Sequence, residues 1–110
     1  KTAFDTASIV NYINEHYMEE LRIASLAEQN HFSETHFRRV FTTYMGMGPL
    51  EYINKVRVHV ACEYLRTTDK SIVSIAGLCG FTNLSTFNRN FNSIMGKSPC
   101  QWRKEIKVYQ

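Results

Sequence analysis

The sequence predicts an all-α fold built from two copies of one helical unit, joined by a long helix. Apolar residues recur at helical spacing along most of the chain, which holds only two prolines and five glycines. One pattern in the first half recurs 49 or 50 positions later. The matching residues are Ile23, Leu26, Ala27, Phe32, Phe41, Met45, Gly46, Pro49 and Tyr52, which correspond to Ile72, Ile75, Ala76, Phe81, Phe91, Met95, Gly96, Pro99 and Trp102. The extra residue must fall between Phe81 and Phe87, and the repeat indicates a duplicated unit of helix, tight turn and helix.

The composition allows one small domain, or two subdomains that share a long helix. The chain has 110 residues, of which 44% are hydrophobic and 13% aromatic, enough for a packed core. The net charge of +3 is unevenly distributed: residues 1–69 carry seven Lys or Arg and nine Asp or Glu, whereas residues 70–110 carry six and one. This asymmetry indicates that one end of the molecule approaches a polyanion.

Several other classes of protein find no support in the sequence. No apolar run approaches the roughly 18 residues of a membrane span, and no secretory signal opens the chain. The spacing of Cys62, Cys79 and Cys100 fits no zinc or disulfide pattern, so we expect buried thiols in a reducing cytosol. His59 and Cys62 alone do not make a metal site. No phosphate loop or catalytic set is present, and we expect neither a cofactor nor an enzyme.

The first two helices are short. Apolar residues predict one helix over residues 8–18, capped by Asp5 or Thr6. A second helix starts near Leu21 and ends near Asn30 and His31, residue types that tolerate the left-handed turn conformation.

The third helix and the long helix follow from capping residues. Ser33 is a suitable N-cap for the third helix, and Gly46 and Gly48 end it. Its expected buried residues are Phe37, Val40, Phe41 and Tyr44. Pro49 opens the long helix, which we expect to run to about Arg66.

The second half repeats these signals. Ser71 caps a fifth helix that ends at Cys79 and Gly80, and Thr82 or Asn83 caps a sixth. The sixth helix is expected to bury Phe87, Phe91 and Ile94. Pro99 opens a closing helix.

The sequence resembles the AraC/XylS family of bacterial transcription regulators from about Ile9 to Ile106. The residues that carry the resemblance are Arg57, Val58, Ala61, Leu65, Ile72, Ile75, Ala76, Cys79, Gly80, Phe81, Phe87, Phe91, Gly96, Ser98, Pro99, Trp102 and Arg103. The resemblance implies seven helices in two homeodomain-like helix-turn-helix subdomains, over about 21–46 and 71–96. A linker helix over about 49–67 joins them, a closing helix covers about 99–107, and the whole of 1–110 forms one DNA-binding domain.

The third and sixth helices each carry a polar stripe that fits a DNA major groove. Opposite the expected buried face lie Thr35, Arg38, Arg39 and Thr42 on the third helix, and Ser85, Asn88, Arg89 and Asn92 on the sixth, with Leu84 and Thr86 near its start. Arginine bonds guanine bidentately, asparagine bonds adenine, and leucine contacts the thymine methyl. The resemblance points to Thr35, Arg38, Arg39, Leu84, Ser85, Thr86, Asn88 and Arg89 as DNA-binding residues, and the stripe adds Thr42.

Each assignment has an alternative. Arg39 and Arg89 also suit a phosphate or a neighbouring acid, Arg38 suits solvent, and Leu84 suits a place under the helix start. The Thr and Ser side chains are more often phosphate-positioning groups than specificity determinants. Residues at the helix ends are expected to bind phosphates, namely Ser33, Thr82, Asn83 and Lys97.

The chain departs from the family pattern at two positions in the first repeat. Arg22 stands where a Ser or Thr cap is common, so we expect the second helix to begin later, around Ser25, or to be looser. His31 stands where the second repeat has Gly80.

We hypothesise that the chain binds duplex promoter DNA as a monomer, at an asymmetric site of two half-elements and with modest DNA bending, because one chain carries both recognition helices. The resemblance implies a regulator at the bacterial nucleoid that contacts RNA polymerase subunits, acting either as an activator or as a repressor. Because the chain begins with Lys1, we expect it to be a piece of a longer protein. The resemblance implies the carboxy-terminal DNA-binding portion of a larger regulator that senses an effector through another domain, and the alternative is a free-standing module of about this length. The alternatives are a sequence-nonspecific architectural DNA-binding protein and a helical protein-interaction module.

Overall fold

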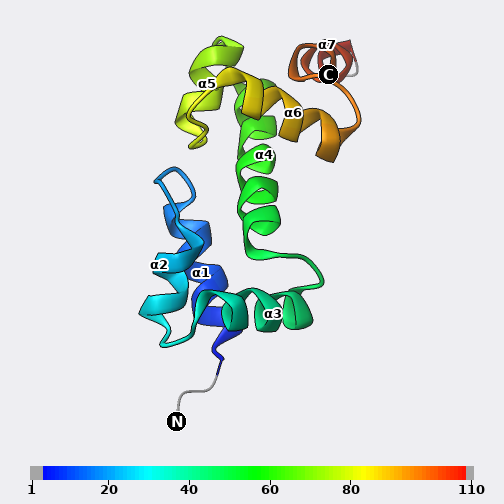
Figure 1. The fold of residues 1–110 in the computed structure, drawn as a ribbon. Helices are drawn as coiled ribbons and strands as arrows, with labels where there is room; N and C mark the ends of the chain where they lie inside the picture. Colours follow the sequence, from blue (N-terminus) through cyan, green and yellow to red (C-terminus); the bar gives the residue numbers. More distant parts are fainter. Residues whose placement is uncertain (1–3, 109–110) are drawn as a thin grey trace. The chain divides into compact units, whose positions relative to one another are not determined.

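The computed structural model describes the backbone of residues 4–108 and the side chains of residues 4–106. This part of the chain folds into seven helices without a strand, as the sequence predicts. The helices are α1 (Thr6–His16), α2 (Ile23–Gln29), α3 (Glu34–Met45), α4 (Pro49–Thr67), α5 (Ile72–Leu78), α6 (Leu84–Met95) and α7 (Pro99–Val108), as Figure 1 shows. No described helix has the length and apolar character that a membrane span requires.

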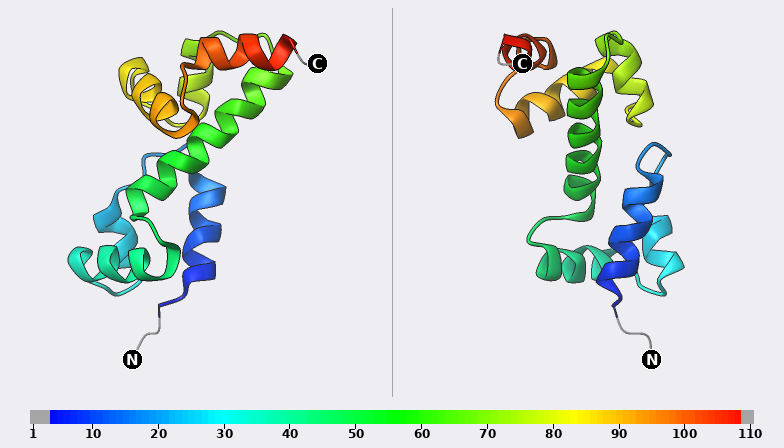
Figure 2. Two further views of the ribbon diagram at one scale, coloured as in Figure 1. Left: turned by 90° about the vertical axis from the view of Figure 1, so that its right-hand side faces the viewer. Right: turned by 180° about the vertical axis from the view of Figure 1, so that it is seen from behind.

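The chain divides into two compact units within α4. The amino-terminal unit comprises Lys1–Ile53 and contains α1, α2, α3 and the first turn of α4, whereas the carboxy-terminal unit comprises Asn54–Gln110. Both units can be followed in the two views of Figure 2. Each therefore contains a helix-turn-helix pair together with one end of α4.

Each unit has its own apolar core. In the amino-terminal unit the buried side chains are Ile9, Ile13, Ile23, Leu26, Ala27, Phe37, Phe41 and Ile53. In the carboxy-terminal unit they are Val58, Ala61, Leu65, Ile75, Ala76, Cys79, Phe81, Phe87 and Phe91. The ring contacts are repeated as well, because Phe41 lies 6.1 Å from Tyr52 and Phe91 lies 6.2 Å from Trp102, between ring centroids.

The tight turns of the two copies share one hydrogen-bond pattern. The amide of Phe32 donates to the carbonyl of Ala27 at 2.9 Å, and the amide of Phe81 donates to that of Ala76 at 3.0 Å. The residue before each phenylalanine is left-handed, with φ of 64° at His31 and 102° at Gly80. The prediction for His31 is thus confirmed, and histidine adopts in the first copy the conformation that glycine adopts in the second.

The predicted caps of α3, α5 and α6 are confirmed. The hydroxyl of Ser33 accepts from the amide of His36, and the hydroxyl of Ser71 accepts from that of Ser74. Asn83, rather than Thr82, caps α6 by accepting from the amide of Thr86 at 2.8 Å. The extra residue of the second repeat therefore lies between Phe81 and this cap.

The first two helices correct the expected boundaries. Helix α1 spans Thr6–His16, two residues earlier at each end than predicted, because the Asp5 carboxylate caps it by accepting from the amide and hydroxyl of Ser8. These hydrogen bonds lower the pKa of Asp5. Helix α2 begins at Ile23, neither at Leu21 nor as late as Ser25.

Arg22 does not delay α2, although its side chain provides no capping hydrogen bond. Its backbone is extended, and its carbonyl accepts from the amide of Leu26 at 3.1 Å. The burial of Ile23, Leu26 and Ala27 therefore holds the helix start without a side-chain cap.

Some expectations about burial were wrong. Tyr44 is 64% exposed rather than buried, and it stacks on Phe4 with ring centroids 5.7 Å apart and an interplanar angle of 5°. Cys100 is exposed, whereas Cys79 is buried and Cys62 lies between these extremes. Val40 and Ile94 are only partly buried.

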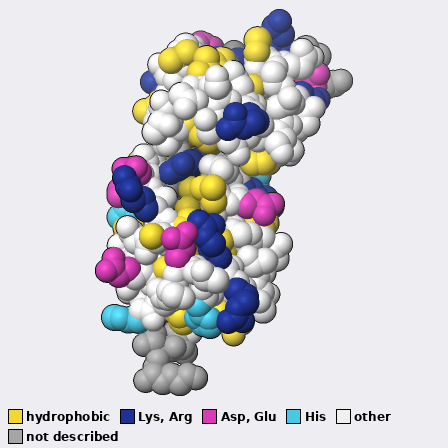
Figure 3. All heavy atoms as spheres, viewed as in Figure 1, with side chains coloured by type: hydrophobic (Ala, Val, Ile, Leu, Met, Phe, Trp, Pro, Cys, Tyr) yellow, Lys and Arg dark blue, Asp and Glu magenta, His cyan; other side chains and the backbone are white. Residues whose placement is uncertain are grey.

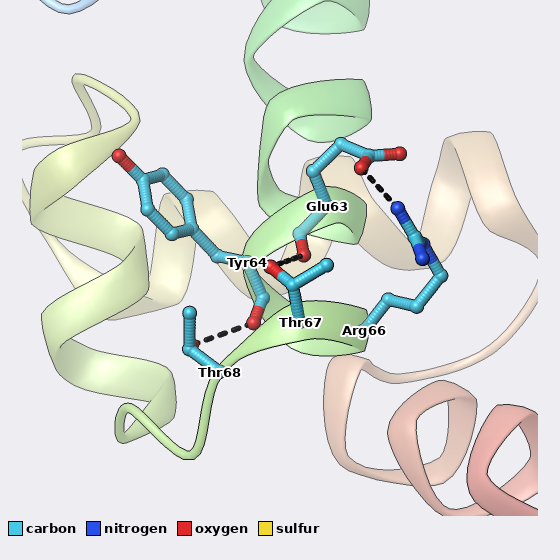
Figure 4. Close-up of polar contacts among 5 residues, drawn as sticks. All are labelled: Glu63, Tyr64, Arg66, Thr67 and Thr68. Carbon is cyan, nitrogen blue, oxygen red and sulfur yellow. Dashed lines mark hydrogen bonds and ion pairs between the residues drawn. The ribbon is translucent and has the colours of Figure 1, made fainter.

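Side chains complete the carboxy-terminal end of α4. The hydroxyl of Thr67 donates to the carbonyl of Glu63, and that of Thr68 donates to the carbonyl of Tyr64, both at 2.7 Å (Figure 4). From α7, Arg103 donates through Nε to the carbonyl of Leu65 at 3.3 Å and through Nη2 to that of Thr68 at 3.2 Å. Arg103 thus satisfies helix-end carbonyls and fastens α7 to α4.

Two glycines of the carboxy-terminal unit should respond to alanine with opposite signs. An added Cβ would meet nothing within 4 Å at Gly77 or at Gly96, but Gly96 has φ of +80°. We expect Gly96→Ala to cost about 1–2 kcal/mol in the free energy of unfolding, and Gly77→Ala to add roughly 1 kcal/mol, since Gly77 lies inside α5. The fluorescence of Trp102, the single tryptophan, reports urea unfolding of this unit. Equal effects of both changes on the free energy of unfolding would contradict the left-handed backbone of Gly96 and the helical backbone of Gly77.

The three thiols should differ sharply in reactivity. Burial is the main cause that raises the pKa of Cys79 to about 12 and that of Cys62 to about 11, so both stay protonated at pH 8. Because the thiolate is the reactive form, we expect a maleimide to modify only the exposed Cys100 quickly. Mass spectrometry should show one rapid addition, which Cys100→Ser abolishes, and three additions after unfolding. A second rapid addition to the folded protein would overturn this expectation.

Candidate DNA-binding interface

The polar stripes of α3 and α6 lie on the exposed side of each helix. Phe37 and Phe41 are fully buried on α3, as are Phe87 and Phe91 on α6. The predicted stripe residues Thr35, Arg38, Arg39, Thr42, Ser85, Asn88 and Arg89 are exposed, Leu84 is 38% exposed, and Thr86 is partly buried. The stripe residues Thr35, Arg38, Arg39 and Thr42 on α3, and Ser85, Asn88 and Arg89 on α6, therefore lie opposite the buried phenylalanines, whereas Leu84 and Thr86 lie to either side of the α6 stripe.

The α3 stripe is tied by hydrogen bonds within its own helix. Arg38 forms an ion pair with Glu34, with Nη2 2.8 Å from Oε2. Arg39 Nη2 lies 2.8 Å from His36 Nδ1, and because arginine has only donors, this nitrogen must accept. The hydroxyl of Thr42 donates to the carbonyl of Arg38 at 2.8 Å.

The α6 stripe carries no ion pair among the described residues. Leu84 and Thr86 occupy the positions that Glu34 and His36 occupy in the first copy, and Asn88 replaces Arg38. Arg89 corresponds to Arg39. The two stripes thus occupy equivalent helix positions, but the arginines of α3 already bond side chains of their own helix.

The predicted phosphate-positioning residues lie at helix ends, but several side-chain atoms are already used. The hydroxyl oxygen of Ser33 and the amide oxygen of Asn83 serve as caps, which leaves the hydroxyl hydrogen and the NH₂ group as donors. Thr82 is exposed. Lys97 is paired with Glu105, whose second oxygen accepts from Gln101 at 2.7 Å. To bind a phosphate, Lys97 would have to break its ion pair with Glu105.

Other basic residues have structural contacts. Arg57 is half-buried, with its guanidinium carbon 5.8 Å from the centroid of the Phe81 ring. Arg103 bonds the end of α4. On the face seen in Figure 3, Lys and Arg side chains stand separately, several of them beside acidic side chains, and they form no continuous basic surface. On this face the distribution of charge therefore marks no interface.

The DNA-binding residues predicted from the sequence include neither Glu34 nor His36. Both lie one turn before an arginine of the stripe and hold its guanidinium. The signal for Glu34 was present, because an acid four residues before an arginine is a favoured helical pair. No group of three metal-ligating side chains occurs among the described residues.

Comparisons with known proteins agree with this arrangement. A family model described as a helix-turn-helix domain matches residues 26–105. The bifunctional transcriptional activator/DNA repair enzyme AdaA of Bacillus subtilis is 37% identical over 91% of this chain and 47% of its own length. The HTH-type transcriptional regulator Rv1931c of Mycobacterium tuberculosis is 39% identical over 76% of this chain and 32% of its own. The chain thus spans less than half the length of these relatives.

Solved structures are similar over nearly the whole chain. The DNA-binding domain of the global transcriptional factor AdpA, crystallised with a target DNA, has a TM-score of 0.90 and 29% identity, over 98% of this chain and 97% of that one. An AraC-type regulator from Chromobacterium violaceum has a TM-score of 0.81 and 26% identity, over 92% and 90%. With seven helices in its described part, a duplicated helix-turn-helix and these matches, the chain belongs to the AraC/XylS family of transcription regulators.

Proposed function

We propose that this chain is the sequence-specific DNA-binding domain of a bacterial transcription regulator, with α3 and α6 entering successive major grooves as recognition helices. The observation that carries the proposal is the duplication of a polar helix face opposite a buried phenylalanine pair. The likeness to the AdpA domain, which was crystallised with a target DNA, supports it. Because one chain carries both helices, a monomer suffices to read an asymmetric site of two half-elements.

The side chains suggest different tasks for the two helices. Arg38 and Arg39 suit guanine, with Thr35 and Thr42 beside them, whereas Asn88 suits adenine and Leu84 a thymine methyl. Ser85, Thr86 and Arg89 complete the second face. Ser33, Thr82, Asn83 and Lys97 are the proposed phosphate contacts, through the donors that their caps and ion pair leave available.

We further propose that the domain acts within a longer, effector-responsive activator of the bacterial cytoplasm that contacts RNA polymerase at the nucleoid. The two curated relatives described above, each longer than this chain, support this proposal: Rv1931c is called a transcriptional regulator, and AdaA is called both an activator and a DNA repair enzyme. We assign no catalytic reaction and no cofactor to this chain.

Selection of binding sites from random duplex DNA tests the function directly. We expect one asymmetric motif with two conserved blocks about one helical turn apart, because each recognition helix reads one groove segment. Affinity should fall steeply with salt, with a log–log slope near −5 for ~6 neutralised phosphates. A single block would confine specificity to one helix. Enrichment of no motif would reject the proposal in favour of an architectural or protein-binding role.

The equivalent arginines of the two helices should act on different blocks. We expect Arg39→Ala to relax a base position in one block and Arg89→Ala one in the other, each at a cost of about 1–3 kcal/mol on the selected site. The matched control is Arg66→Ala, because Arg66 is also exposed but lies on α4, where it forms an ion pair with Glu63. Binding titrations on the selected site and on single-base variants measure the effect. A loss that is uniform over all sequences would assign these arginines to phosphates instead.

A further inference from the structure

Arg38 reaches Glu34 through only one edge of its guanidinium. Its Nε lies 3.0 Å, and its Nη2 2.8 Å, from the same oxygen, Oε2 of Glu34. A guanidinium has five N–H donors in a planar fork, and the edge between Nε and Nη2 is the one that the carboxylate takes. The terminal edge, with Nη1 and the second hydrogen of Nη2, remains for another acceptor.

The second copy forms the equivalent helix without an acid at this position. In α6 the equivalent position is Leu84, and α6 has the same length of 12 residues, a side-chain N-cap and a left-handed glycine at its end, as α3 has. An acid in the first turn does favour a helix through the dipole. However, α6 reaches the same length with Leu84 at the equivalent position, so this helix of the repeat does not require a first-turn acid in both copies.

A carboxylate in this place costs DNA affinity unless it contributes to recognition. Glu34 is the first residue of α3, beside Ser33, which is a proposed phosphate contact, and both members of its ion pair are about half exposed. There a negative charge repels the phosphate backbone. The same charge competes with phosphates for Arg38, and phosphates are the sequence-independent partners of arginine.

Resting on the DNA-binding function proposed above, we propose that Glu34 is a specificity-determining positioning residue for α3. It holds the Nε edge of Arg38, so that the terminal edge faces the N7 and O6 acceptors of a guanine. It also keeps this arginine from binding phosphates. His36 holds Arg39 through one Nη donor in a similar way. The first recognition helix is thus preorganised for bases, whereas α6 carries no such acid.

The experiment compares Glu34→Ala and Glu34→Gln with the wild-type chain. Site selection and titrations on single-base variants first identify the guanine whose preference Arg38→Ala removes. The control is Glu63→Ala, which breaks a surface ion pair with Arg66 on α4. Circular dichroism verifies that each variant is folded, and Glu34→Gln serves if the alanine variant is not, since it keeps the side-chain shape and loses the charge.

We expect Glu34→Ala to reduce discrimination at that guanine by about fivefold, the upper range for an exposed ion pair. Preferences in the other block should stay within twofold. Binding to random DNA should become tighter, and its log–log salt slope steeper by up to about 0.9, because the freed Arg38 reaches a phosphate. A purely structural role would weaken binding to all sequences alike.

Unchanged discrimination and slope in both Glu34 variants would overturn the inference and leave the proposed function intact. An Arg38→Ala variant that changes no base preference would overturn it as well, since Arg38 would then not read a base. If the wild-type chain itself selects no motif, the proposed function fails, and the inference fails with it.

Discussion

Burial of two phenylalanines on each recognition helix is the constraint on which the rest of the structure depends. Phe37 and Phe41 on α3, and Phe87 and Phe91 on α6, are fully buried. Replacing such a side chain by alanine typically costs 3–5 kcal/mol, against roughly 1 kcal/mol for an N-cap. The phenylalanines therefore decide which face of each helix packs inward, and the polar stripe is exposed because it lies opposite them.

The duplicated turn adds a second constraint. Its hydrogen bonds run to the Ala27 and Ala76 carbonyls in the same way, although His31 occupies the left-handed position in one copy and Gly80 in the other. A left-handed conformation is uncommon for histidine, but the hydrogen bonds of the turn maintain it. The turn hydrogen bonds and the buried phenylalanines are thus the same in both copies, whereas residues that take no part in them differ.

This divergence is concentrated on the exposed faces of the recognition helices. The first copy has Glu34, His36, Arg38 and Arg39, which form two intrahelical contacts, and the second has Leu84, Thr86, Asn88 and Arg89. Equal frameworks with unequal faces suit a protein that recognises two different half-elements with a single chain. Arg103, by contrast, bonds the carbonyl groups at the end of α4, so a basic residue near the second recognition helix serves the framework instead.

The sequence by itself determined the all-α class, the repeat, the caps at Ser33 and Ser71 and the buried phenylalanines, and it narrowed the cap of α6 to Thr82 or Asn83. These features depend on local rules: side-chain periodicity, the hydrogen bonds of a helix end and the fixed φ of proline. Most of the candidate DNA-binding residues were identified in this way, because a stripe opposite a buried face is itself periodic. Only the tertiary structure decided that Tyr44 is exposed beside Phe4, that α2 begins at Ile23 without a side-chain cap, and that Arg103 closes α4. Those outcomes depend on residues distant in the chain, whose approach no local pattern encodes.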